Sequence, residues 1–134
     1  MAVVASAGGC AADYAGASAQ ARQRAETVRI SVEEGTTGVT PSRQALADDV
    51  AAALRAHGAS GDVFSQAVED GSTVVGFWVD GTIQSNGGVF QPPDARVRLC
   101  VELVSVDGGG LELRDAECAG RALPVPEGRR VIRL

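Results

Sequence analysis

The spacing of the apolar residues changes near residue 61, and this change constrains the fold more than any other feature of the chain. Before it, Leu46, Val50 and Leu54 recur at the spacing of one helix face. After it, the period becomes two, so that residues 97–103 carry an apolar side chain at every second position. Helices followed by strands predict an α+β domain, and 134 residues suffice for one such domain with a modest core.

Two helices are expected in the first half of the chain. The first spans residues 19–34 and has small apolar side chains on one face, namely Ala21, Ala25, Val28 and Val32. Residues 27–33 also alternate with strand period, but we favour a helix that ends at Gly35. For the second helix we expect Thr40 as the cap, Pro41 at the first helical position and Gly58 at the end.

An antiparallel meander of about four strands is expected after the helices. Asp70-Gly71 lies between residues 63–68 and 73–79 and predicts a tight hairpin, because both turn positions need positive φ. We expect the third and fourth strands at residues 96–106 and 111–118. A turn at residues 86–88 and a short strand at residues 130–134 complete the prediction. The strand aromatics, Phe64, Phe77 and Trp78, are expected to pack in the core.

Cys100 and Cys118 lie on either side of the three glycines of 108–110. If these glycines form the hairpin loop, Cys100 falls opposite Cys118, where the Cα atoms are within disulfide range. The same register places Asp115 opposite Leu103, which is an unfavourable pairing. The alternatives are two buried thiols in a reduced protein or a pair of metal ligands. Because no second ligand pair has a suitable spacing, we expect no metal site.

Residues 1–10 are interpreted as the remnant of an export signal. Ala7-Gly8-Gly9-Cys10 resembles the lipobox of bacterial lipoproteins, which implies lipid attachment at Cys10. Ala7 stands where that family usually has leucine, and no basic residue precedes Cys10. Either the true start lies upstream, or the match arose by chance in a chain rich in alanine and glycine. Residues 11–18 are then expected to form a flexible tether, and residues 19–134 a single domain.

The chain also resembles small lipoproteins of unassigned function from high-GC bacteria. The likeness rests on Cys10, on the helical residues 19–57, and on Cys100 with Cys118. It implies a domain tethered to the membrane through its lipid, at the outer face of the cell membrane or outside the cell, and it brings no activity with it. The net charge of −5 argues against nucleic acid as a partner.

No pattern in the sequence predicts an active site or a cofactor. His57 is the single histidine and lies at a predicted helix end, where solvation or capping is expected. Asp48 and Asp49 are adjacent on a helix and point about 100° apart, so they are expected to be solvated. The arginines near the C-terminus either contact anionic lipid headgroups or form a solvated end; they are Arg129, Arg130 and Arg133.

These observations predict a non-enzymatic protein of the cell envelope that binds a protein or small-molecule ligand through its sheet or loops. A second hypothesis is a cytoplasmic subunit or regulatory domain with free thiols. A third is a small enzyme that uses Cys100 or Cys118 as a nucleophile.

Overall fold

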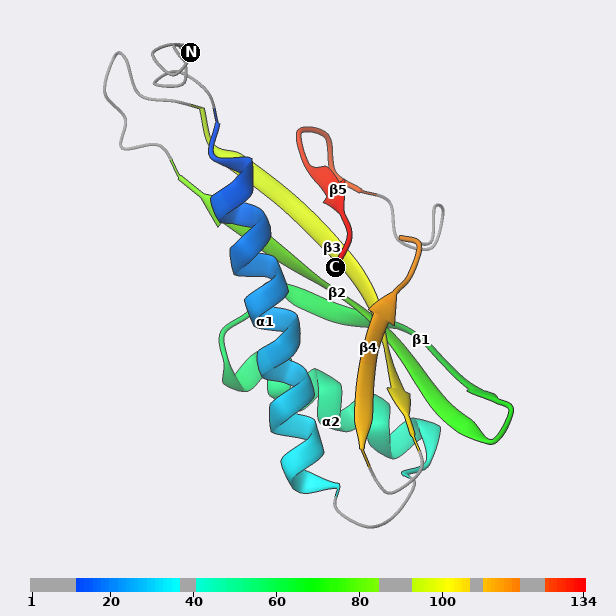
Figure 1. Ribbon diagram of the computed structural model, residues 1–134. Coiled ribbons are helices and arrows are strands. Elements are labelled where there is room, and N and C mark those ends of the chain that lie inside the picture. The colour runs from blue at the N-terminus through cyan, green and yellow to red at the C-terminus, as the bar shows by residue number, and fades with distance from the viewer. Residues whose placement is uncertain (1–11, 37–40, 85–92, 107–109, 119–124) are drawn as a thin grey trace, which may run out of the picture.

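The computed structural model describes residues 12–36, 41–84, 93–106, 110–118 and 125–134. Within these residues two helices precede five strands, which confirms the predicted α+β class (Figure 1). The elements in chain order are α1 (Tyr14–Gly35), α2 (Arg43–Ala56), β1 (Gly61–Glu69), β2 (Ser72–Ile83), β3 (Ala95–Ser105), β4 (Leu111–Asp115) and β5 (Arg130–Ile132). The predicted turn at residues 86–88 lies outside the described residues.

Helix α1 begins earlier than its apolar pattern indicates. The Asp13 carboxylate accepts a hydrogen bond from Gly16 N at 2.8 Å and thereby caps the first turn. Ala17 and Ser18 are buried. The prediction of a flexible tether at residues 11–18 is therefore wrong for residues 13–18, which form the cap and the first turn of α1. The helix prediction for residues 27–33 is confirmed, at the cost of leaving Ile30 44% exposed.

Helix α2 is capped by Ser42 and not by the predicted Thr40, which lies outside the described residues. Ser42 Oγ accepts from Ala45 N at 3.1 Å, so Pro41 precedes the cap and is not the first helical residue. At the other end, Gly58 has the positive φ of 63° that a Schellman ending needs, as predicted. Ala59 N donates to Leu54 O at 3.0 Å to complete that motif.

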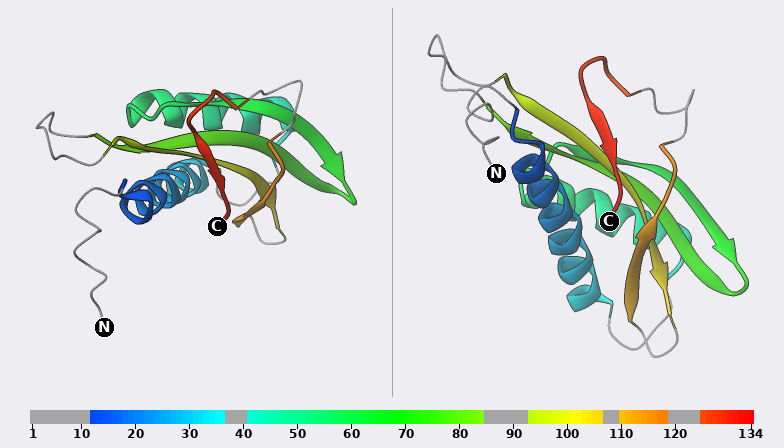
Figure 2. Two further views of the ribbon diagram at one scale, coloured as in Figure 1. Left: turned by 90° about the horizontal axis from the view of Figure 1, so that it is seen from above. Right: turned by 45° about the horizontal axis from the view of Figure 1, so that its top comes forward.

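Strands β1 to β4 form the predicted antiparallel meander in the order β1-β2-β3-β4. The hairpin turn between β1 and β2 is confirmed, because Asp70 and Gly71 both have positive φ, 50° and 82°. The last strand is an addition to the meander: β5 pairs with β3 in parallel. Strands β4 and β5 consequently follow one another along the same edge of β3 (Figures 1 and 2).

Both helices contribute to a single core on one face of the sheet. Helix α1 packs on β2, β3 and β4, and α2 packs on β1 and β2. The contacting strand side chains include Val75, Phe77, Val79, Val97, Leu99, Val101 and Leu103. Gly81 lets α1 come close, because a Cβ at this position would lie 2.0 Å from Ala17 O. The opposite face of the sheet, here called the helix-free face, carries the alternate side chains of the same strands.

Candidate functional site

A buried ionic cluster lies on the helix-free face. Asp80 of β2 and Arg98 of β3 are directly paired across the two strands. Arg98 donates from Nε to Asp80 Oδ1 at 2.8 Å and from Nη2 to Asp80 Oδ2 at 3.1 Å. The two side chains are only 7% and 4% exposed, so this fork-shaped pair is largely removed from water.

Arg129, which immediately precedes β5, adds a second positive charge to the cluster. Its Nη1 atom lies 3.1 Å from Asp80 Oδ2. Arg129 Nε and Nη1 are buried and have no hydrogen-bond partner of good geometry among the described residues. One carboxylate is thus shared by two guanidinium groups, and it connects the C-terminal segment to the centre of the sheet.

Trp78 lies beside this cluster on the same face. The Arg98 guanidinium carbon is 3.8 Å from the centroid of the Trp78 ring, which is a cation–π contact. Trp78 is half-buried, and so is Phe64 of β1, whose ring occupies the space that a Cβ atom on Gly76 would need. The expectation that Trp78 and Phe64 pack in the core is therefore wrong. Of the three predicted strand aromatics, Phe77 is the one that points toward the helices.

The Cys100–Cys118 disulfide supports the same region, with an S–S distance of 1.99 Å and a Cα–Cα distance of 5.4 Å. Cys100 is the cross-strand partner of Trp78. The disulfide itself was predicted from the sequence, but the predicted register was wrong by two residues. Ala116, and not Cys118, lies opposite Cys100 and donates to its carbonyl at 3.1 Å.

The register differs because Gly110 belongs to the ladder and not to the loop. Val106 N donates to Gly110 O at 2.9 Å. Leu111 N donates to the Glu33 carboxylate at 2.7 Å, which holds the start of β4 against α1. Leu103 therefore pairs with Leu113, and the unfavourable pairing of Leu103 with Asp115 does not occur. The chain leaves the strand after Asp115, and Cys118 turns back over Cys100.

A chain of exposed ion pairs flanks the aromatic side chains. Arg114 Nε donates to Glu102 Oε1 at 2.7 Å, and Arg114 Nη2 donates to Glu69 Oε1 at 3.0 Å. The hydrogen bonds that Arg114 donates to Glu102 and, with a smaller effect, to Glu69 raise the pKa of Arg114 above its ordinary value. Because Arg114 and Glu69 are about half exposed and Glu102 is partly exposed, the pairs add little stability. They give the helix-free face a charged margin.

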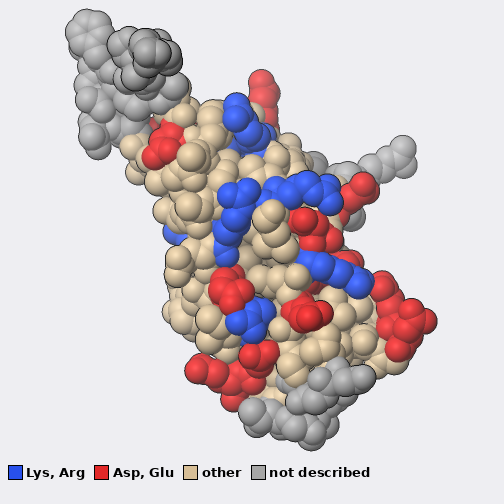
Figure 3. All heavy atoms as spheres, viewed as in Figure 1, with Lys and Arg blue, Asp and Glu red and all other residues tan. Residues whose placement is uncertain are grey.

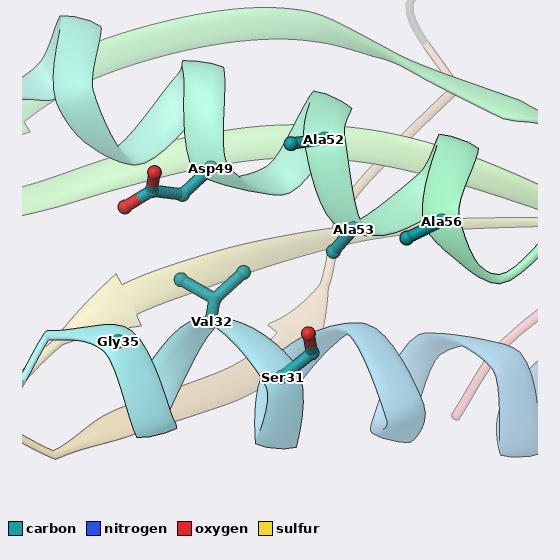
Figure 4. Close-up of a pocket in the computed structure, with 7 residues that line it drawn as sticks. All are labelled: Ser31, Val32, Gly35, Asp49, Ala52, Ala53 and Ala56. Carbon is teal, nitrogen blue, oxygen red and sulfur yellow. The ribbon is translucent and has the colours of Figure 1, made fainter.

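A groove separates the two helices on the other side of the molecule. It has a volume of about 260 Å³ and is lined by Ser31, Val32, Gly35, Asp49, Ala52, Ala53 and Ala56. Figure 4 shows Ser31 and Val32 pointing from α1 toward α2. A smaller cavity of about 180 Å³ shares Ser31 and is also lined by His57. No hydrogen bond between described residues joins Ser31 to His57 or Asp49, so the groove presents no assembled nucleophile–base pair.

The predicted site residues fall in different places. Cys10, the predicted lipid attachment site, lies outside the described residues. Asp48, Asp49 and His57 are exposed on α2 or at its end. No pattern in the sequence indicated the cluster of Asp80, Arg98 and Arg129, since the pairing of Asp80 with Arg98 depends on the register of β2 and β3.

Within the described part of the chain, no group of three or more His, Cys, Asp or Glu residues is suited to hold a metal ion. None of the described helices is both long and apolar enough to cross a membrane. Comparisons with protein-family models, with curated proteins and with solved structures gave no match.

Proposed function

We propose that the protein is an exported, non-enzymatic binding domain that is anchored to the cell membrane by a lipid on Cys10. The observation that carries the proposal is the Cys100–Cys118 disulfide. Disulfides persist in oxidising compartments outside the cytoplasm and are rare in reduced ones. The lipobox-like residues before Cys10 support the same location independently of the disulfide.

The helix-free face around Trp78 is the binding surface in this proposal. Tryptophan and phenylalanine are enriched in protein interfaces, and the half-buried Trp78 and Phe64 both lie on this face. Arg98 is itself buried and supports the Trp78 ring through the cation–π contact. Arg98 is held by two hydrogen bonds to Asp80. The disulfide crosslinks the strand next to Trp78. A partner would therefore meet aromatic side chains on a rigid support, which reduces the entropic cost of binding.

The anchor is tested on the protein isolated from its native host. We expect mass spectrometry to find an acylated Cys10 as the N-terminal residue and a peptide crosslinked through Cys100 and Cys118. A Cys10→Ala variant should move from the membrane fraction to the soluble fraction or the medium. Unmodified Met1 in the cytosol together with free thiols would contradict the proposal and favour the intracellular subunit.

The binding surface is tested by photo-crosslinking in the same host. A photoreactive amino acid replaces Ser65, which is exposed beside Phe64 on the helix-free face. The matched control carries it at Arg43, which is exposed on α2. We expect a discrete adduct with the Ser65 variant that is lost when Trp78→Ala is added. The same adducts from both positions would show that the partner does not recognise this face.

A further inference from the structure

A second surface lies where the first half of α1 meets β5. Arg22 donates from Nε and Nη2 to Arg133 O at 2.9 and 2.7 Å. The Arg130 guanidinium carbon lies 3.6 Å from the centroid of the Tyr14 ring. These contacts join the two elements, and Figures 1 and 2 show β5 beside the first half of α1. We call Tyr14, Arg22, Arg130 and Arg133 the basic patch.

The positive charges of the basic patch remain accessible to solvent. Arg22, Arg130 and Arg133 are all exposed, and the Arg133 side chain is 74% exposed. Its acidic neighbour is Asp115, which lies 3.7 Å from Arg133 Nε and also accepts from Leu134 N at 2.7 Å. Figure 3 shows a band of arginine side chains across the upper half of this face, whereas acidic side chains predominate in the lower half. The surface charge is therefore unevenly distributed, although the chain as a whole carries −5.

The basic patch is also close in sequence to the proposed anchor. Cys10 precedes Tyr14 by only four residues, and Tyr14 is the first residue of α1. An acyl group on Cys10 would hold the start of α1, and with it β5, near the bilayer. Tyrosine is favoured at the membrane–water interface, where its ring and hydroxyl meet different surroundings. Arginine beside it is attracted to anionic headgroups.

We propose that the basic patch binds the anionic surface of a phospholipid bilayer and fixes how the domain is oriented on the membrane. The proposal rests on the proposed function, because the lipid on Cys10 is what brings the patch to the bilayer. The occupant is a membrane surface and not a soluble anion, since the three arginines lie on an open surface formed by two elements. The exposed arginines and the short stretch of sequence between Cys10 and Tyr14 both favour a membrane surface.

The test uses the full chain with Cys10→Ser, so that no acyl chain contributes to binding. The disulfide-bonded protein is sedimented with phosphatidylcholine vesicles that either contain or lack phosphatidylglycerol. We expect binding only to the vesicles with phosphatidylglycerol, and weaker binding as the ionic strength rises. Arg130→Gln with Arg133→Gln should lower the partition coefficient about thirtyfold, because each arginine removed costs roughly fivefold near an anionic surface.

The matched control is Arg43→Gln with Arg55→Gln, which changes the net charge equally through exposed arginines of α2. Equal losses in the two double variants, or equal binding to both kinds of vesicle, would overturn the proposal. Release by inorganic phosphate at constant ionic strength would also overturn it, in favour of a soluble anion. If the vesicle experiment contradicts binding by the basic patch, acylation of Cys10 is not thereby contradicted, because the mass of the N-terminal peptide tests acylation separately.

Discussion

Replacing Asp80 with asparagine is expected to lower the free energy of unfolding by about 3–5 kcal/mol. The carboxylate is 4% exposed and faces Arg98 and Arg129, so its removal leaves two guanidinium charges without compensation in a largely dry site. Desolvation of an unpaired buried charge is costly, whereas an amide of the same shape supplies only a neutral acceptor. Urea denaturation followed by circular dichroism at constant pH, with the disulfide intact, measures this loss.

The control is an exposed ion pair of the same chemistry. Glu102→Gln neutralises the carboxylate that accepts from Arg114 and should cost less than about 1 kcal/mol, because the Arg114 side chain is 49% exposed and that of Glu102 is 24% exposed. The double variant Asp80→Leu with Arg98→Met tests the mechanism, since it removes the carboxylate together with one of the two guanidinium groups and keeps apolar volume, so that only Arg129 is left without its partner. It should be more stable than Asp80→Asn alone. Equal small losses for Asp80→Asn and Glu102→Gln would mean that water reaches the cluster.

The features predicted correctly from the sequence are those that depend on neighbouring residues. The apolar stripe of α2 and the glycine that ends it are local signals, and so is the Asp70-Gly71 turn. Residues 97–103 indicated a strand with one apolar face, and that face lies against the helices. Each signal spans a few residues, so no information about distant contacts was needed.

The predictions of the tether and of the hairpin loop were wrong because they relied on composition and not on the role of individual residues. Residues 11–18 look like a tether because most of them are small, but Asp13 is a capping residue and the alanines after it fit closely against the sheet. In the same way, three consecutive glycines allow the hairpin loop to shift by one position. A shift of one position in the loop changes the pairing by two residues, which explains the misplaced partner of Cys100.

The candidate site was missed because its residues meet only through the sheet. The alternation that directs Phe77 to the helices also directs Trp78 and Asp80 to the opposite face, so this part was available from the sequence. The pairing of Asp80 with Arg98 needed the register of β2 and β3. The approach of Arg129 needed the parallel pairing of β5, which no local pattern indicates.

Reducing the Cys100–Cys118 disulfide is expected to lower the free energy of unfolding by about 3 kcal/mol, as the chain-entropy model gives for a loop of this size. The bridge spans 18 residues and holds the segment after β4 against the centre of β3. Reduction should add about two mass units to the intact protein. The double variant Cys100→Ala with Cys118→Ala should show a similar loss in stability without reductant.

The variant Cys10→Ala is the control, because it removes the third cysteine and leaves the bridge unchanged. It should unfold like the unmodified chain with and without reductant. Cys100 lies close to Arg98 on β3, and its cross-strand partner Trp78 packs on the Arg98 guanidinium, so loss of the disulfide should weaken the contact between Arg98 and Asp80. We therefore expect Asp80→Asn to cost less after reduction than before it. If the losses in unfolding free energy from reduction and from Asp80→Asn are fully additive, the disulfide and the cluster stabilise the fold independently. A loss below about 1 kcal/mol on reduction would likewise contradict a role for the disulfide in holding the cluster.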